Sequence, residues 1–156
     1  MSPILPAPSG NLHNEMLGIW WLLSRTDWTQ EGQLRIDPIL GRDPVGILSY
    51  ATTHFAAQFS RRDRAVQASV SNSKASQNNT AALDGYDAYF GTYEVNESTG
   101  IVAHTLIGSV VPSNVGLTVF RDLRVQNDQL TIQLTTTSAH EESIIRTLVW
   151  KRMLNF

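Results

Sequence analysis

The stretch FGTYEVNESTGIVAHTLIGSVV, residues 90–111, decides the fold class because it has the pattern of two β-strands joined by a tight turn. Its two outer parts, residues 90–95 and 101–111, are rich in the β-branched and aromatic residues that favour strands. Residues 96–100 between them are polar and end in Gly100, which is typical of a hairpin turn. The stretch therefore predicts an antiparallel hairpin.

Further runs of the same composition surround this hairpin, at residues 19–26, 45–53, 54–62, 117–125, 130–137 and 144–152. They are bounded by Gly, Asn, Asp, Pro and Ser, and the sequence QNDQ at residues 126–129 predicts a second hairpin turn. Neighbouring runs are close in sequence, so simple hairpins connect them without a helical crossover. An antiparallel up-and-down sheet of about eight strands or more closes most readily into a barrel, which removes its exposed edges. We therefore predict an all-β fold with a single barrel.

The beginning of the chain differs from the strand-rich remainder. Residues 1–11 are rich in proline and carry no Lys or Arg, so we expect a flexible leader, followed by one barrel domain at residues 12–156. The sequence NLHNEMLG, residues 11–18, predicts a short helix that ends at Gly18. The leader lacks the features of a signal peptide, so we expect a cytoplasmic protein.

The segment near residues 65–90 interrupts the strand pattern. It begins with a long run rich in Ser, Asn and Ala, and a loop of this length inside a compact domain is usually functional or partly disordered. We expect a lid-like loop or short helix here, which would bring Tyr86, Tyr89 and Phe90 to the mouth of the barrel.

Composition excludes several classes of function. The net charge is −2 and no basic block occurs, so the chain has no feature that would recruit nucleic acid or an anionic membrane. There are no cysteines, and the four histidines have no paired spacing, so we expect no metal site. Phosphate-binding glycine motifs and a nucleophile elbow are also missing, so we expect no cofactor.

The order of several motifs resembles a known family. Gly18-Ile19-Trp20 opens the first run and is similar to the Gly-x-Trp of lipocalins. Together with DPVGILSY, YFGTYEV, AHT and LVWKR, it resembles the small lipocalin-like domain family of bacteria and fungi, over Met16 to Arg152. The resemblance implies a barrel that binds apolar small molecules, and some lipocalin-like proteins in biosynthetic pathways act as cyclases or isomerases without a cofactor. Trp21 departs from the family pattern and is a candidate either for contact in a homodimer or for packing under the leader.

Alternation along each strand predicts which side chains face the interior. The inward sets that we expect from four strands are Trp20, Leu22 and Ser24; Gly46, Leu48 and Tyr50, a choice that the resemblance favours; Gly91, Tyr93 and Val95; and Leu117, Val119, Arg121 and Leu123. For residues 101–111 two sets remain open, one with His104, Leu106, Gly108 and Val110, the other with Ala103, Thr105, Ile107 and Ser109.

The polar candidates for catalysis are His104, Tyr93 and Arg121. His104 titrates near neutrality and suits proton transfer, but a core histidine bonded to a tyrosine or a carbonyl is the alternative. Arg121 lies among apolar residues, where a charge must be paired or must bind an anion. It either anchors a carboxylate, enolate or phenolate, or packs against a tryptophan at the closed end. Arg152 is the rival for that contact, against Trp20.

The candidates for ligand binding are mostly aromatic or aliphatic, namely Trp20, Leu22, Leu48, Tyr50, Tyr86, Tyr89, Phe90, Leu106 and Leu117. Ordinary aromatic packing is the alternative for the tyrosines. Asp84 and Asp87 flank Gly85, so we assign them to a turn.

Three functions follow from this interpretation. The first is binding of a small apolar or aromatic metabolite in the barrel cavity. The second is a cofactor-independent isomerase or cyclase that encloses its substrate and moves a proton. The third is a filled barrel that contacts a protein partner through Trp21, Trp28 or the leader.

Overall fold

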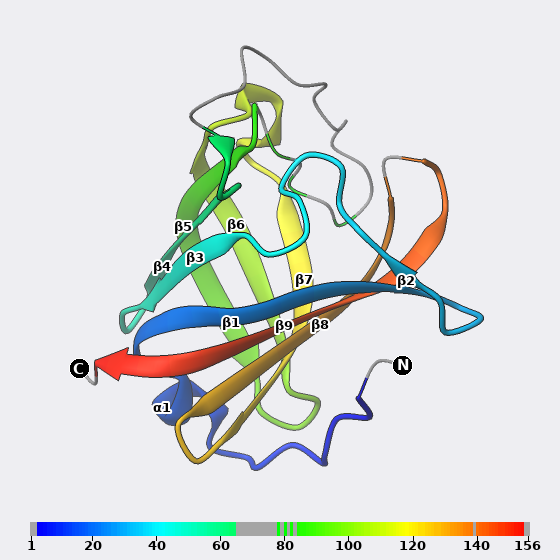
Figure 1. Cartoon of the computed structure of the whole chain (residues 1–156). Helices are drawn as coiled ribbons and strands as arrows, with labels where there is room; N and C mark the ends of the chain where they lie inside the picture. Colours follow the sequence, from blue (N-terminus) through cyan, green and yellow to red (C-terminus); the bar gives the residue numbers. More distant parts are fainter. Residues whose placement is uncertain are drawn as a thin grey trace.

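The computed structural model shows a closed antiparallel barrel (Figure 1). It describes residues 3–64, 78, 80, 82, 84–138 and 140–154. The described strands, in chain order, are β1 (Gly18–Thr29), β2 (Leu34–Arg35), β3 (Val45–Tyr50), β4 (His54–Ser60), β5 (Tyr86–Asn96), β6 (Ile101–Ser109), β7 (Thr118–Gln126), β8 (Gln129–Thr137) and β9 (Ser143–Leu154). Helix α1 (Leu12–Met16) precedes β1, and the 3₁₀ helix η2 (Pro112–Asn114) joins β6 to β7.

The sheet follows the chain. Each strand from β3 to β9 pairs with the next, and β1 pairs with both β3 and β9, which closes the ring. β2 pairs only with the far end of β1 and is the strand that the sequence did not predict. The predicted up-and-down barrel and the short helix are confirmed.

The hairpin that decided the fold class forms β5 and β6. Tyr93 pairs with His104, and Gly100 closes the turn with a φ of 78°. A bulge opposite Phe90 and Gly91 brings the two backbones together, so a Cβ at Gly91 would collide with the Thr105 carbonyl. Glycine is therefore required there.

The expected lid is partly wrong. β5 begins at Tyr86, so Tyr86, Tyr89 and Phe90 are strand residues. Asp87 is also part of β5 and is buried, whereas we had assigned it to a turn. Residues 65–77 of the expected lid lie outside the described residues.

The closed end of the barrel is built around Trp20, at the level of α1. Trp20 is fully buried, and its Nε1 donates to the Met16 carbonyl at 2.9 Å. The Arg152 guanidinium carbon lies 4.2 Å from the centre of the Trp20 ring, and its two terminal nitrogens donate to the Leu17 and Glu15 carbonyls at 2.8 and 2.7 Å. Arg152, and not Arg121, therefore packs against the tryptophan at the closed end.

A β-bulge in β1 changes which side chains face inward. Leu22 pairs with Trp150 and Ser24 with Val149, so Leu23 is an extra residue. Trp20 and Leu22 face inward as predicted, but beyond the bulge the inward positions pass from Ser24 to Arg25 and Asp27.

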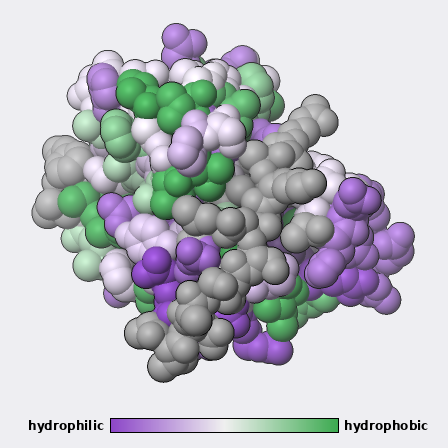
Figure 2. Space-filling view, turned by 90° about the horizontal axis from the view of Figure 1, so that it is seen from above, coloured by the Kyte–Doolittle hydropathy of each residue, from purple (hydrophilic) through white to green (hydrophobic). Residues whose placement is uncertain are grey.

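The leader contacts the outside of the barrel at two described residues. The Pro6 carbonyl accepts a hydrogen bond from Arg124 Nε at 2.6 Å, and the Pro3 carbonyl accepts one from Gln133 Nε2 at 2.6 Å. Among the described helices, none has the length and apolar character needed to cross a membrane. Seen from above, hydrophobic side chains form several separate groups between hydrophilic ones (Figure 2).

Candidate functional site

A cavity inside the barrel is lined from β1 and from every strand between β3 and β9. Its lining falls into an aromatic group, an aliphatic group and a charged group. The aromatic group consists of Tyr50, Phe55, Phe59, Tyr89, His104 and Trp150. The charged group consists of Arg25, Asp87, Arg121 and Arg146. The cavity has a free volume of about 50 Å³, which is room for about four waters.

A hydrogen bond between Tyr50 and His104 anchors the aromatic group. The Tyr50 hydroxyl lies 2.6 Å from His104 Nε2, and the Phe55 ring packs edge-on against His104 with ring centres 4.5 Å apart. Burial and the positive charge of Arg121 lower the pKa of His104 to about 3, and the nearby Val102 backbone does not offset them. Burial also raises the pKa of Tyr50. Both groups are therefore neutral at physiological pH.

Two arginines of the charged group are held by two aspartates. Arg146 Nε and Nη2 donate to the two carboxylate oxygens of Asp27 at 2.8 and 3.1 Å, and Arg25 Nη1 lies 3.0 Å from Asp37 Oδ2. A longer contact of 3.7 Å joins Arg146 to Asp37. Burial alone would raise the pKa of Asp37, but Arg25, Arg146 and the Ile39 and Leu40 amides outweigh it and lower that pKa to about 2. These four side chains therefore form a network of two arginines and two aspartates, whose charges cancel.

Arg121 enters the cavity from β7 and is also buried. Its Nη1 donates to Asn78 Oδ1 at 3.0 Å and to the Phe120 carbonyl at 3.1 Å. Burial lowers the pKa of Arg121 to about 10, so the guanidinium keeps its charge at neutral pH. Asn78 lies beside β7 and β8, beyond their last pair of Asp122 and Gln133, and its Nδ2 donates to the Phe120 and Thr135 carbonyls.

Asp87 reaches the same cavity from β5. Its Oδ2 accepts a hydrogen bond from Thr80 Oγ1 at 2.9 Å. Burial raises the pKa of Asp87 to about 7, against the opposing effects of Thr80, Arg25 and Arg146. Asp87 is therefore the one cavity carboxyl among the described residues whose charge changes near neutral pH.

Buried polar atoms without a partner concentrate at this cavity. Four such side-chain atoms occur among the described residues, and three belong to the lining: Asp87 Oδ1, His104 Nδ1 and Trp150 Nε1. Buried polar atoms in folded proteins are nearly always hydrogen-bonded. The lining thus offers two nitrogens and a carboxyl oxygen to whatever occupies the cavity.

The part of the chain that the structure describes has no group of three or more His, Asp or Glu side chains placed to hold a metal ion. A family model of a lipocalin-like domain matches residues 17–153 of the sequence. The chain belongs to this lipocalin-like family. No curated protein matches the sequence.

The lipocalin-like cavity brings together part of the predicted site. Leu48, Tyr50, Tyr89, His104 and Arg121 line it. His104 and Leu106 face inward, which decides between the two sets left open for β6.

Four predicted residues are buried but do not line the cavity: Trp20, Leu22, Leu106 and Tyr93. Tyr93 is turned to the closed end, where its hydroxyl donates to the Ala51 carbonyl at 2.5 Å and its ring stacks on His13.

Three more predicted residues lie outside the cavity. Phe90 is 52% exposed on the outer face of β5. The Tyr86 hydroxyl donates to Gln58, whose side chain is exposed, and the ring packs against Arg64. Leu117 was expected to face inward, which is wrong: it precedes β7 and is 37% exposed.

Sequence reasoning missed most of the charged group and much of the aromatic group. Arg25 turns inward only because of the bulge at Leu23, and no sequence signal marks that bulge. Asp87 follows Gly85 by two residues, which led to its assignment to a turn instead of a strand. Phe55, Phe59 and Trp150 alternate with exposed or partly exposed residues on β4 and β9, so the alternation rule applied to those strands would have found them.

Proposed function

We propose that this lipocalin-like barrel binds one small, largely apolar or aromatic organic molecule in its cavity. The observation that carries the proposal is the position of the three unpartnered atoms, Asp87 Oδ1, His104 Nδ1 and Trp150 Nε1, on a lining otherwise rich in aromatic and aliphatic side chains. Small-molecule sites combine an apolar wall with a few polar groups that fix orientation. A ligand with polar substituents would supply the partners that these atoms lack.

The free volume limits the buried part of the ligand. A cavity of about 150 Å³ admits one benzene ring, so the free volume of about 50 Å³ takes an aromatic ring only if the surrounding side chains move outward. The ring would contact the edge or face of Phe55, Phe59 or Trp150, whose side chains are already buried. Arrangements of this kind between aromatic rings contribute about 0.5–1.5 kcal/mol beyond area burial.

The test fills the cavity from a position that has a matched control. Ala57 lines the cavity, and its neighbour Ala56 on β4 faces outward and is exposed. A panel of single-ring compounds, including benzamide, phenol and benzoate, would be titrated into wild type, Ala57→Phe and Ala56→Phe. We expect binding to wild type and Ala56→Phe and its loss in Ala57→Phe. Ala57→Leu serves where the larger side chain prevents folding.

Two results would overturn the proposal. Binding that survives in folded Ala57→Phe would place the ligand elsewhere. Failure of the whole panel to bind, together with native mass spectra that show no co-purifying molecule, would favour the filled barrel, for which the outward-facing Trp21 is a contact candidate at 39% exposure.

A cofactor-independent isomerase or cyclase is the second candidate, and the Tyr50–His104 contact favours it. A proton-transfer isomerase exchanges substrate C–H protons with solvent. If the co-purifying molecule is a substrate, wild type in D₂O should therefore incorporate deuterium into it, and His104→Gln should not. With its pKa at about 3, His104 is a weak base in the free protein. No deuterium uptake by wild type would reject proton-transfer catalysis and leave the binding function in place.

A further inference from the structure

We propose that the molecule bound in the cavity is an organic monoanion, and that its acid group is held by Arg121. This inference rests on the proposed binding function and adds the charge of the ligand to it.

Arg121 has no carboxylate partner. All 14 acidic side chains of the chain belong to described residues, so a structural count of its Asp and Glu partners is complete. No carboxylate oxygen of these residues lies within 4.0 Å of the Arg121 guanidinium, whose bonds go to Asn78 and to the Phe120 carbonyl. Arg121 is only 8% exposed, and a buried cation without an anion is costly.

The other cations at the cavity are already balanced. Arg146 grips Asp27 with two hydrogen bonds, and Arg25 pairs with Asp37. Two positive charges therefore face two negative charges, and neither aspartate is left over for Arg121. The three arginines of the described lining and the two aspartates that pair with Arg25 and Arg146 together carry one positive charge in excess when Asp87 is protonated.

Asp87 is the remaining carboxyl at the cavity, and it does not form an ion pair with Arg121. Its Oδ2 is taken by Thr80, and its buried Oδ1 has no partner among the described residues. Arg25 on β1 and Arg146 on β9 act on the pKa of Asp87, and both are engaged by other aspartates. Asp87 also acts on the pKa of Arg121, but after burial, Tyr89, Arg146 and Tyr50, and without an ion-pair contact. A ligand acid group beside Arg121 would supply the missing charge, and protonated Asp87 could then donate its Oδ1 proton to the ligand.

The shape of the guanidinium narrows the class of acid. Arg presents a planar fork of N–H donors that matches a carboxylate or a similar planar oxygen anion. The aromatic group lies in the same cavity, as Tyr50 and Tyr89 both act on the Arg121 pKa. A ring bearing a carboxylate, enolate or phenolate combines the two features.

The test compares an acid with its neutral isostere. Benzoate and benzamide differ by one charge at nearly constant shape, and both would be titrated calorimetrically at about pH 6, where Asp87 is mostly protonated. We expect wild type to bind benzoate at least roughly tenfold more tightly than benzamide. Arg121→Gln should abolish the preference, and Arg121→Lys should keep part of it.

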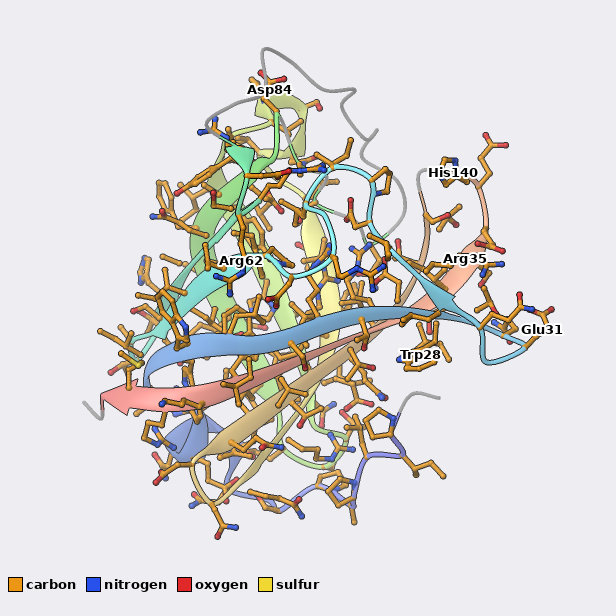
Figure 3. All side chains as sticks on the ribbon, viewed as in Figure 1. Trp28, Glu31, Arg35, Arg62, Asp84 and His140 are labelled. Carbon is orange, nitrogen blue, oxygen red and sulfur yellow. The ribbon has the colours of Figure 1, made fainter. Side chains whose placement is uncertain are left out.

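Arg35→Gln is the matched control, because it removes the same charge from β2 at the outer edge of the molecule, where Arg35 pairs with Glu142 (Figure 3). It should retain the full preference for benzoate. A preference that disappears in Arg35→Gln as well would reflect net charge alone and overturn the assignment to Arg121.

Asp87→Asn keeps the inference testable if Arg121→Gln does not fold. At about pH 8, ionised Asp87 repels an anion, so Asp87→Asn should bind benzoate at least roughly threefold more tightly than wild type, with benzamide unchanged. No gain for benzoate would overturn the inference.

The outcomes separate this inference from the proposed function. Equal binding of benzoate and benzamide in wild type would leave a binding cavity but exclude the anion site. A benzoate preference that persists in Arg121→Gln would move the anchor to another residue. If neither compound nor any other member of the single-ring panel binds, the binding function fails and the inference fails with it.

Discussion

The closed end of the barrel and the cavity above it use similar residues in opposite ways. At the closed end, Trp20 is buried and Arg152 is partly buried, and the polar atoms of both are bonded. Trp20 Nε1 donates to the Met16 carbonyl, and Arg152 donates to two carbonyls and to Asp128 and stacks on the indole. In the cavity, Trp150 is as deeply buried, but among the described residues its Nε1 has no partner and Arg121 has no carboxylate partner.

This difference shows which part of the barrel is the better candidate for a functional site. A buried polar atom left without a partner costs about 1–3 kcal/mol, so a fold keeps such atoms only where something else compensates. Satisfied groups at the closed end stabilise the barrel, and unsatisfied groups in the cavity reduce its stability unless the proposed ligand supplies their partners.

The largest effect is expected at the closed end. Trp20→Ala removes a fully buried ring, its hydrogen bond to Met16 and the surface on which Arg152 stacks. We expect a loss of about 4 kcal/mol in the free energy of unfolding, measured by urea denaturation. Trp21→Ala is the control on the opposite face, 39% exposed, and should cost less than about 1 kcal/mol. Similar losses for both would show that Trp20 does not anchor the closed end.

The next largest effect is expected at the ion pairs of the charged group, in which Arg146 is held by Asp27 and Arg25 by Asp37. Asp27→Asn removes the charge that Arg146 grips with two hydrogen bonds, so Arg146 keeps only the longer contact with Asp37 among the ion pairs described. Breaking one partner of a buried pair costs about 3 kcal/mol, again measured in urea. Asp43→Asn, in an exposed pair with Arg62, should change stability by less than about 0.5 kcal/mol.

The third prediction concerns the pH dependence of the free energy of unfolding, to which Asp87 and His104 contribute. The pKa of Asp87 rises from 3.8 to about 7 on folding, so Asp87 destabilises the folded state progressively as the pH rises from about 4 to about 7. His104 acts in the opposite direction: its pKa falls from 6.5 to about 3, so stability is lost as the pH falls below about 6.5. The two effects offset each other in wild type, which should show a flat profile between these limits.

Asp87→Asn separates the two effects. At about pH 8 we expect the variant to be more stable than wild type by about 2 kcal/mol, because the charged carboxylate is no longer buried. At about pH 4 the two proteins should be nearly equal. Urea denaturation across this range measures the difference. An advantage for wild type at high pH would mean that ionised Asp87 is stabilised by a partner.

The sequence was sufficient for those parts of the fold that depend on local pattern. The family resemblance favoured the inward set with Tyr50, and His104 stayed open between two sets until the structure decided. The β5–β6 hairpin followed from composition and a turn ending in Gly100, and alternation placed Arg121 on the inner face. These features need only neighbouring residues. The closing contact of Arg152 on Trp20 was one of two alternatives, and the structure decided between them.

The charged group could not be predicted because it depends on register between distant strands. Asp27 and Arg146 are 119 residues apart and meet because β1 pairs with β9. One extra residue, Leu23, reverses the alternation and turns Arg25 inward. A rule with a period of two fails after any unmarked bulge, and the error then affects every later residue of that strand.

The smallest effect is expected for the hydrogen bond between Tyr50 and His104 inside the cavity. Tyr50→Phe keeps the ring but removes the hydroxyl that meets His104 Nε2 at 2.6 Å, which leaves that buried nitrogen without its hydrogen bond. We expect a loss of about 1 kcal/mol in urea denaturation. Tyr86→Phe removes a hydroxyl that bonds to Gln58 on the outer face, where water can replace it, so the loss should be smaller. If the two variants are equally stable, the Tyr50–His104 bond contributes nothing beyond a surface contact, and the cavity would hold its aromatic group by packing alone.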